Sequence, residues 1–298
     1  MISKKTKIGF IGTGIIGLPM AINLSKNKYD VYAYSRNPKY HAAITKKGIK
    51  IIKNLKEFFA EIDILILAVS DTKDVKEVLV GSKGLINSIS NISIVIDMST
   101  ICPIETIRIS KILKQNNMSL IDAPVSGGEI GAIKGSLSIM VGGDAKIVKK
   151  IMPIFKILGE KITHIGDSGA GQIAKTCNQT IVAQTLNGIS EAFMIADKFN
   201  VDKLNIRSAL LGGFANSKVL ETHAKRILDK DFEPGFKTKL HAKDLRITNN
   251  IAKKKNLKLP GTSIVNKNMN KCNKEGYGEK DSSAYYYMVK KQNKWELY

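Results

Sequence analysis

Three segments of this 298-residue sequence combine residue types and spacings that can do chemistry. Two are rich in glycine: KIGFIGTGIIGLPMAINL near the start, and DAPVSGGEIGAIKGSLSIMVGG from Asp122 to Gly143. The third is GQIAKTCNQ, in which Lys175 is the charged residue. One glycine-rich phosphate loop is enough for one nucleotide. We therefore expect the second loop to hold a different ligand, and to hold it against a reactive group elsewhere in the chain.

The first segment has the pattern G-x-G-x-x-G between an expected strand and an expected helix. Its first glycine permits a tight turn, its second lets the backbone approach a pyrophosphate, and its third lets the helix pack closely on the strand. The helix N-terminus then faces the negative charge. A turn that binds no ligand is the alternative. The predicted dinucleotide contacts are Gly12, Thr13, Gly14, Ile15, Ile16 and Gly17.

The strand that follows ends in YAYSRNP, and this ending bears on the choice of nucleotide. NAD-selective sites commonly place an acidic residue about 20 residues past the glycine turn, where it binds the ribose 2′-hydroxyl. Here the chain has Ser35 and Arg36 instead. A guanidinium beside a hydroxyl suits a 2′-phosphate. The cofactor prediction is therefore NAD(P)H with a preference for NADPH; a surface arginine, and hence NADH, is the alternative.

The second segment offers a site for a carboxylate. Ser126, Gly127 and Gly128 follow an expected strand at 119–123 and Pro124. Successive backbone N–H groups without a Cβ in the way can close around an anion, and the serine hydroxyl adds a donor. A plain glycine-rich turn is the alternative reading.

Lys175 and Asn178 open an expected long helix and, being three residues apart, share one of its faces. They lie beside an apolar stripe of Ile173, Cys177 and Ile181. A lysine in this setting commonly extends its ammonium to solvent. The alternative is that Lys175 faces a nicotinamide and donates a proton. Cys177 is expected to pack in the core, although a thiol enzyme acting through it is a further alternative.

Short β-branched runs alternate with amphipathic segments over residues 1–165, which is typical of a doubly wound, mostly parallel α/β sheet of Rossmann type. After GDSGAGQ the strand signals largely vanish, so residues 166–298 are expected to form an all-helical domain for substrate binding and oligomerisation. The expected strands are 7–11, 31–34, 62–69, 93–97, 119–123, 136–141 and 162–165. The expected helices are 19–26, 73–79, 104–115, 145–158, 172–200, 217–228, 239–255 and 263–275.

The net charge of +21 raises nucleic acid as a possible partner. The lysines are dispersed, however, aromatic residues make up only 6%, and no DNA- or RNA-binding motif accompanies the charge. Nucleic acid is therefore not an expected partner. Apolar runs are too short to span a bilayer, and the segment after Lys7, which imitates a secretory signal, contains glycines and Pro19 that favour a strand and helix instead.

Three cysteines without a CxxC pair argue against a disulfide framework and against a structural zinc site. A reducing cytoplasm is the expected location. The sequence also contains no clustered set of His, Cys or carboxylate residues, so no metal is expected.

Taken in order, several motifs resemble the β-hydroxyacid dehydrogenase family, and the resemblance extends from about Lys7 to about Tyr285. These motifs are GFIGTGIIGLPMAINL, AVSDTKDVKEVL, IDMSTICP, DAPVSGGEIGAIKGSLSIMVGGD, GAGQIAKTCNQ and HAKDL. The resemblance implies that Lys175 is the catalytic lysine, that residues 126–128 bind the substrate carboxylate, and that Asn178 orients the substrate. Ile16 stands where relatives commonly have methionine. Besides the glycine turn, the implied cofactor contacts are Val69, Ser70, Asp74, Thr100 and Lys243.

Within the family, GGFANSKVLETHAKRI and FEPGFKTKLHAKDL are most similar to members that reduce 2-hydroxy-3-oxopropanoate to glycerate. The resemblance thus implies a small carboxylate-bearing aldehyde as substrate and assembly into homo-dimers or homo-tetramers. The same chemistry on 3-hydroxyisobutyrate, glyoxylate or succinic semialdehyde is the nearest alternative. A non-catalytic nucleotide-binding module with a basic surface is an alternative of another class.

Overall fold

The computed structural model describes residues 2–35, 38 and 41–294. Its contacts divide the chain into two units, the first ending at Lys175 and the second beginning at Thr176. The division falls later than the predicted boundary between 165 and 166, because the first turn of the helix that begins at Ala170 is hydrogen-bonded to the sheet unit.

In the described part of the chain, the strands of the first unit form one nine-stranded sheet in the order β3-β2-β1-β4-β5-β6-β8-β7, with β9 beside β8. Strands β1 to β6 are parallel, and β8 is antiparallel to both β6 and β7. The strands are β1 (Lys7–Ile11), β2 (Asp30–Tyr34), β3 (Lys50–Ile51), β4 (Ile64–Leu67), β5 (Ile94–Asp97), β6 (Ser119–Asp122), β7 (Val125–Ser126), β8 (Leu137–Gly142) and β9 (Gly159–Gly166).

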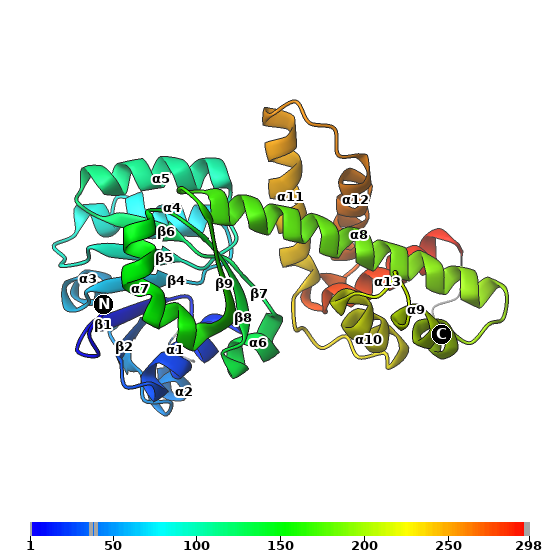
Figure 1. The fold of residues 1–298 in the computed structure, drawn as a ribbon, viewed down its shortest axis with the longest axis horizontal. Helices are drawn as coiled ribbons and strands as arrows, with labels where there is room; N and C mark the ends of the chain where they lie inside the picture. Colours follow the sequence, from blue (N-terminus) through cyan, green and yellow to red (C-terminus); the bar gives the residue numbers. More distant parts are fainter. Residues whose placement is uncertain (1, 36–37, 39–40, 295–298) are drawn as a thin grey trace. The chain divides into compact units, whose positions relative to one another are not determined.

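Helices cover both faces of this sheet, and Figure 1 shows α4 and α5 on one side and α1 and α2 on the other. Alternate residues of the buried strands supply the two cores: Ile64 and Ile66 pack with α1 and α7, while Leu65 and Leu67 pack with α3, α4 and α5. The helices are α1 (Gly17–Lys26), α2 (His41–Thr45), α3 (Leu55–Glu61), α4 (Thr72–Val80), α5 (Pro103–Gln115), α6 (Gly128–Lys134) and α7 (Ala145–Leu158).

This architecture confirms the predicted fold class of a Rossmann-type sheet followed by an all-helical part. All seven expected strands are present, with ends shifted by a few residues in most of them. The short elements β3, β7, α2, α3 and α6 were not predicted, and two of them, β7 and α6, lie within the second glycine-rich segment.

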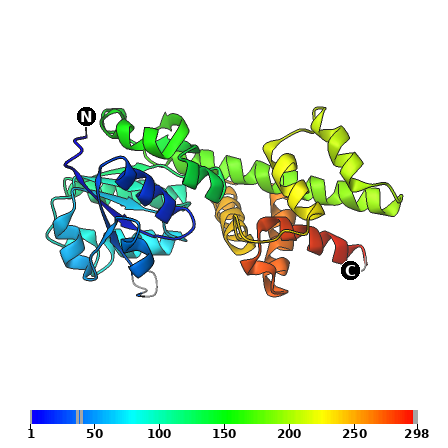
Figure 2. The same ribbon diagram turned by 90° about the horizontal axis from the view of Figure 1, so that it is seen from below.

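The second unit is helical, and Figure 2 shows its helices, coloured from green to red, packed around one another. Its core is formed by residues such as Phe193, Leu245, Met269 and Tyr285. The expected helix at 217–228 is a π-helix, Leu220–Ala224, followed by α10 (Lys225–Leu228). The other helices are α8 (Ala170–Lys198), whose first turns belong to the first unit, α9 (Lys203–Leu211), α11 (Thr238–Lys254), α12 (Pro260–Lys274) and α13 (Tyr285–Gln292).

Among the described residues, no helix combines the length and apolar character needed to cross a membrane. The same part of the chain has no group of three or more His, Cys, Asp or Glu side chains placed to hold a metal ion.

Candidate active site

The first glycine turn joins the end of β1 to the start of α1. Gly12 has φ +99°, and a Cβ there would lie 2.2 Å from the Ala68 carbonyl oxygen. A Cβ on Gly17 would lie 1.8 Å from the carbonyl oxygen of Gly12, whereas one on Gly14 would meet no atom within 4 Å. The first and third glycines are thus required by the protein's own packing, and the second leaves open space.

That open space fits the approach of a dinucleotide pyrophosphate. Among the described residues, no side chain forms a capping hydrogen bond at the N-terminus of α1. The start of this helix is therefore open to an anion, which its backbone N–H groups can bind. Gly14 and Ile15 are exposed, while Thr13 and Ile16 are partly buried. The residues present therefore match what a dinucleotide requires.

Other predicted cofactor contacts follow the carboxyl ends of neighbouring parallel strands. In the register of the sheet, Ile11 of β1 pairs with Leu67 of β4, and Leu67 pairs with Asp97 of β5. Val69 and Ser70 follow β4, and Thr100 follows β5, so these residues lie near the same edge as the glycine turn. Ligands of open α/β sheets bind at this edge.

A small hydrogen-bond network fixes the backbone at this edge. The Val69 N–H donates to Ser99 Oγ at 2.9 Å, and the Ser99 N–H donates to Asp97 Oδ1 at 3.0 Å. Asp74 helps to cap the N-terminus of α4. Its Oδ2 accepts a hydrogen bond from the Asp71 N–H at 3.0 Å, as part of a capping box. Its cofactor role stays a prediction.

The predicted 2′-phosphate position follows β2, the strand beside β1. Ser35 is partly buried, and its carbonyl oxygen lies 3.0 Å from Nε2 of His41. Arg36 lies outside the described residues.

The second glycine loop leaves β6, forms β7 against β8, and then turns into α6. Ser126 ends β7, with its partner Ser138 on β8. Gly127 and Gly128 follow with φ of +137° and +62°, both in the region that favours glycine. A turn with no Cβ at these two positions leaves its backbone N–H groups accessible to an anion.

Lys175 lies on α8 and reaches this loop. Its Nζ donates a hydrogen bond of 2.7 Å to the carbonyl oxygen of Val125, the residue directly before Ser126. The side chain is not extended to solvent, since Lys175 is 7% exposed. The structure therefore brings the predicted catalytic ammonium and the predicted carboxylate loop together within the first unit.

Two buried polar residues to which the sequence analysis gave no role hold the start of α8. Asp122 ends β6 and accepts backbone N–H bonds from Gly169 and Gln172. Gln172 binds the backbone of Ser99 and Ile101 with its side-chain amide. A signal was available, because a charged residue that closes a buried apolar strand is costly unless it is hydrogen-bonded.

Two further predicted residues belong to the second unit, where a chain of contacts joins them. Asn178 Nδ2 donates to Gln179 Oε1 at 2.8 Å, and Gln179 Nε2 donates to Asp244 Oδ2 at 2.6 Å. Lys243 then forms an ion pair with Asp244 Oδ1 at 2.7 Å. These contacts link the Asn178 and Lys243 side chains through Gln179 and Asp244 within the second unit.

Cys177 was expected to pack in the core, and this was wrong. Cys177 is exposed, and Ile173 and Ile181 are 52% and 66% exposed. The opposite side of α8 supplies the core residues instead, among them Leu186 and Phe193.

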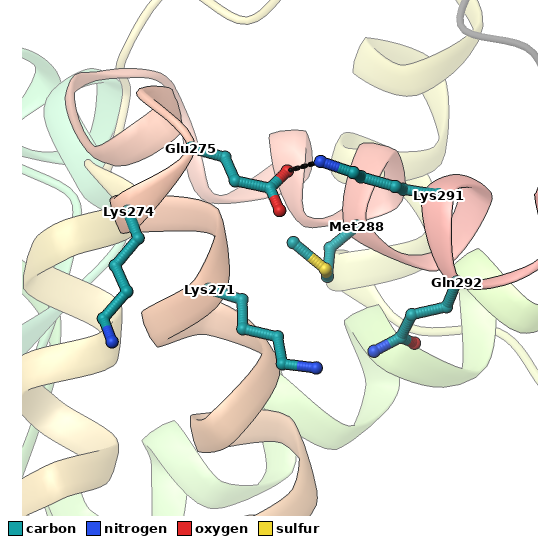
Figure 3. A pocket seen from close by; sticks show the side chains of 6 residues that line it. All are labelled: Lys271, Lys274, Glu275, Met288, Lys291 and Gln292. Carbon is teal, nitrogen blue, oxygen red and sulfur yellow. Dashed lines mark ion pairs between the residues drawn. The ribbon is translucent and has the colours of Figure 1, made fainter.

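A surface pocket of about 350 Å³ lies in the second unit, and Figure 3 shows it between α12 and α13. Its lining contains none of the predicted site residues. Glu275 in this pocket pairs with Lys291 at 3.0 Å, and the Lys274 ammonium points away from them. The pocket is therefore not part of the candidate active site.

Comparison with known proteins agrees with the geometry of the first unit. Residues 7–166 match the family model for the NAD binding domain of 6-phosphogluconate dehydrogenase. Residues 169–289 match the model described as NAD-binding of NADP-dependent 3-hydroxyisobutyrate dehydrogenase. Together the two models extend over nearly all of the described chain.

Individual relatives are similar over the same length. The 2-hydroxy-3-oxopropionate reductase of Escherichia coli (strain K12) is 40% identical over 93% of this chain and 95% of its own. The 2-(hydroxymethyl)glutarate dehydrogenase of Eubacterium barkeri is 31% identical over 94% of both. A solved structure of Mycobacterium tuberculosis 3-hydroxyisobutyrate dehydrogenase with L-serine has a TM-score of 0.86 and 27% identity, covering 96% of this chain and 99% of that one. The chain therefore belongs to the β-hydroxyacid dehydrogenase family and is an NAD(P)-dependent oxidoreductase.

Proposed function

We propose that this enzyme reversibly reduces 2-hydroxy-3-oxopropanoate (tartronate semialdehyde) to glycerate with NAD(P)H. The observation that carries the proposal is the hydrogen bond from Lys175 Nζ to the Val125 carbonyl, which sets an ammonium beside the glycine loop of residues 126–128. The choice among short aldehyde acids is supported by the 40% identity to the Escherichia coli 2-hydroxy-3-oxopropionate reductase.

The loop of residues 126–128 binds the substrate carboxylate in this mechanism. Its backbone N–H groups, turned by the positive φ of Gly127 and Gly128, donate to the carboxylate oxygens together with the Ser126 hydroxyl. Hydrogen bonds to a charged group contribute about 1.5–3 kcal/mol each. The carboxylate end is thereby fixed, and the aldehyde end is directed toward Lys175.

Lys175 acts on the carbonyl oxygen. A lysine ammonium is protonated at neutral pH and has three N–H donors. Lys175 stabilises the negative charge that develops on the oxygen during reduction and then supplies the proton of the new hydroxyl group. In the oxidative direction the neutral amine takes the proton back. General acid catalysis of this kind contributes about 10²- to 10⁴-fold.

A nicotinamide cofactor, when bound, supplies the hydride for reduction. The glycine turn at residues 12–17 binds its pyrophosphate through the uncapped start of α1 and the open space at Gly14. Ser35 and Arg36 bind a 2′-phosphate, which is the basis for proposing NADPH as the preferred form. Val69, Ser70 and Thr100, at the same sheet edge, complete these contacts.

The resemblance to the family is the basis for the roles proposed for Asn178, Lys243 and Asp74. Asn178 orients the substrate, while Lys243 and Asp74 contact the cofactor. Assembly into homo-oligomers belongs to the same proposal. Large exposed apolar side chains on α8 and directly after it support this assembly, since Ile181, Ile195 and Phe199 are 66%, 62% and 75% exposed.

The test is a comparison of kcat/KM for four aldehyde acids with NADH and with NADPH. The acids are 2-hydroxy-3-oxopropanoate, 2-methyl-3-oxopropanoate, glyoxylate and succinic semialdehyde. We expect the highest value for 2-hydroxy-3-oxopropanoate with NADPH. A higher value for another acid would replace the proposed substrate, and salt-sensitive DNA binding without turnover of any acid would favour the non-catalytic module.

A further inference from the structure

The carboxylate of Asp122 lies fully buried against the start of α8. Its Oδ1 accepts the Gly169 N–H at 2.8 Å and its Oδ2 accepts the Gln172 N–H at 2.9 Å. The first N–H groups of a helix have no partner within the helix, and its N-terminus favours negative charge. Asp122 therefore binds the first turn of a helix that extends over 29 residues.

Gln172 adds a second attachment of the same turn. Its Oε1 accepts the Ile101 N–H at 3.0 Å, and its Nε2 donates to the Ser99 carbonyl at 2.8 Å. The Gln172 side chain is fully buried, so neither bond competes with water. The start of α8 is thus held both to the end of β6 and to the segment after β5.

These contacts form a closed ring with the candidate active site. Val125 follows Asp122 by three residues along the chain, and Lys175 follows Gln172 by three residues along α8. The hydrogen bond from Lys175 Nζ to the Val125 carbonyl closes the ring. Asp122 is therefore attached to the carboxylate loop through the chain and to the lysine-bearing helix through hydrogen bonds.

Two glycines make room for this arrangement. A Cβ on Gly142 would lie 2.7 Å from both carboxylate oxygens of Asp122. A Cβ on Gly171 would lie 2.4 Å from the Met140 carbonyl oxygen and 2.7 Å from the Asp122 carbonyl oxygen. Any side chain at these positions would displace the start of α8 or the Asp122 carboxylate. Glycine at both positions therefore allows the start of α8 to pack directly against Asp122.

We propose that Asp122 is a positioning residue that fixes the Lys175 ammonium relative to the substrate loop. The inference rests on the proposed function, in which Lys175 acts on the substrate carbonyl. Asp122 does not touch the reacting atoms; it acts through the first turn of α8. A small displacement of a catalytic group is enough to lower turnover by about 10²-fold.

The test is Asp122→Asn, which keeps one carbonyl acceptor but places an amide group against a backbone N–H. We expect kcat to fall by about 10- to 100-fold, with the dissociation constant of the nucleotide and the KM of the acid nearly unchanged. The matched control is Asp144→Asn, because Asp144 caps α7 through the Lys146 and Ile147 N–H groups at 2.8 and 3.2 Å. This control should leave kcat unchanged.

A double-mutant cycle distinguishes positioning from general stabilisation of the fold. If Asp122 acts through Lys175, the loss caused by Asp122→Asn should largely disappear in a Lys175→Ala background. A kcat of Asp122→Asn equal to that of the unchanged protein, or a loss that persists at full size in the Lys175→Ala background, would overturn the inference.

A readout without turnover separates this inference from the proposed function. Hydrogen exchange of the amides at 169–176 should accelerate in Asp122→Asn and not in Asp144→Asn, whichever substrate the enzyme uses. Unchanged exchange would overturn the inference. Absence of turnover with every acid in the unchanged protein would overturn the proposed function alone. If Asp122→Asn does not fold, Gln172→Met is the second variant, because it removes the hydrogen bonds of the Gln172 side chain to Ser99 and Ile101. The same changes in kcat and in hydrogen exchange are expected for it.

Discussion

Lys175 Nζ donates its 2.7 Å hydrogen bond to the Val125 carbonyl, a backbone atom of the chain that continues into Ser126 and the two glycines. The acceptor of this bond is a neutral backbone carbonyl, which orients the ammonium toward the loop. An ammonium has three N–H donors, and a bond to Val125 is compatible with a second bond to a substrate oxygen. In the proposed mechanism, catalysis and substrate binding therefore depend on the same short segment.

Replacement of Lys175 should remove turnover and spare nucleotide binding. Lys175→Ala is expected to lower kcat by at least about 10²-fold, the lower end of the range for general acid catalysis. Lys175→Arg should also be impaired, since a guanidinium keeps its proton. Steady-state kinetics and fluorescence titration of the nucleotide measure the two effects. Lys134→Ala, at an exposed lysine of α6, is the control; near-normal turnover of Lys175→Ala contradicts the role.

Loss of the Ser126 hydroxyl should weaken recognition of the acid group. A hydrogen bond to a charged group contributes about 1.5–3 kcal/mol, so Ser126→Ala is expected to lower kcat/KM by roughly 10- to 100-fold. The change should appear mainly in KM for a carboxylate-bearing aldehyde. An aldehyde without a carboxylate, such as glyceraldehyde, serves as the control substrate, and an equal loss with it would exclude Ser126 from carboxylate binding.

The glycine turn offers a pair of substitutions with opposite expected outcomes. Gly17→Ala would put a Cβ 1.8 Å from the Gly12 carbonyl oxygen, so it should destabilise folding by about 1–3 kcal/mol or more. Gly14→Ala meets no protein atom within 4 Å and should fold normally. A nucleotide at Gly14 would clash with the added methyl group, which should weaken its binding roughly 10- to 100-fold. Denaturant unfolding and nucleotide titration measure both variants; unchanged nucleotide affinity in Gly14→Ala would place the pyrophosphate elsewhere.

The sheet could be predicted from the sequence because its strands are continuous apolar runs flanked by turn residues. Strand β4 illustrates this, since residues 64–67 are all buried and pack on both faces. The short elements β7 and α6 could not be predicted. Glycines at 127, 128 and 131 disfavour helix by about 1 kcal/mol each, and only pairing with β8 and packing with α1 select the observed conformation.

The position of the glycine turn and the placement of Lys175 beside the second glycine loop were predictable, because residue type alone limits the chemistry there. The roles of Asp122 and Gln172 were not, because each depends on contacts with residues about 50 to 70 positions away. The expectation for Cys177 failed for a related reason. An apolar stripe on a helix indicates which side chains share a face, but not which face meets the core.

Arg36→Ala tests the cofactor preference inferred from YAYSRNP. Removal of the guanidinium should raise the KM for NADPH by roughly 10- to 100-fold, the loss expected for a hydrogen bond to a charged group. The KM for NADH should change little, because NADH lacks the 2′-phosphate. Initial rates with both nucleotides at saturating acid measure the ratio. Equal effects on the two nucleotides would remove Arg36 from 2′-phosphate recognition.

The second unit carries a charge cluster whose contribution to stability should depend on pH. Hydrogen bonds from Lys239, the larger contributor, and from Lys237 lower the pKa of Glu279 to about 2. The Lys237 Nζ donates to Glu279 Oε2 at 2.9 Å. A carboxyl pKa lower in the folded than in the unfolded chain stabilises the fold above the ordinary value near 4.3. That contribution is lost as the pH falls through about 2.

Glu279→Gln should therefore lower the Tm slightly at pH 7, and the difference from the unchanged protein should shrink as the pH falls from about 4.3 toward 2. The effect should be small because Glu279 is solvent-exposed, and it should weaken in about 1 M salt, where the Debye length is about 3 Å. Calorimetry at several pH values provides the measurement, with Glu233→Gln, another exposed carboxylate of this unit, as the control. A Tm difference that stays constant from pH 7 to pH 2 would mean that Glu279 acts through packing and not through its charge.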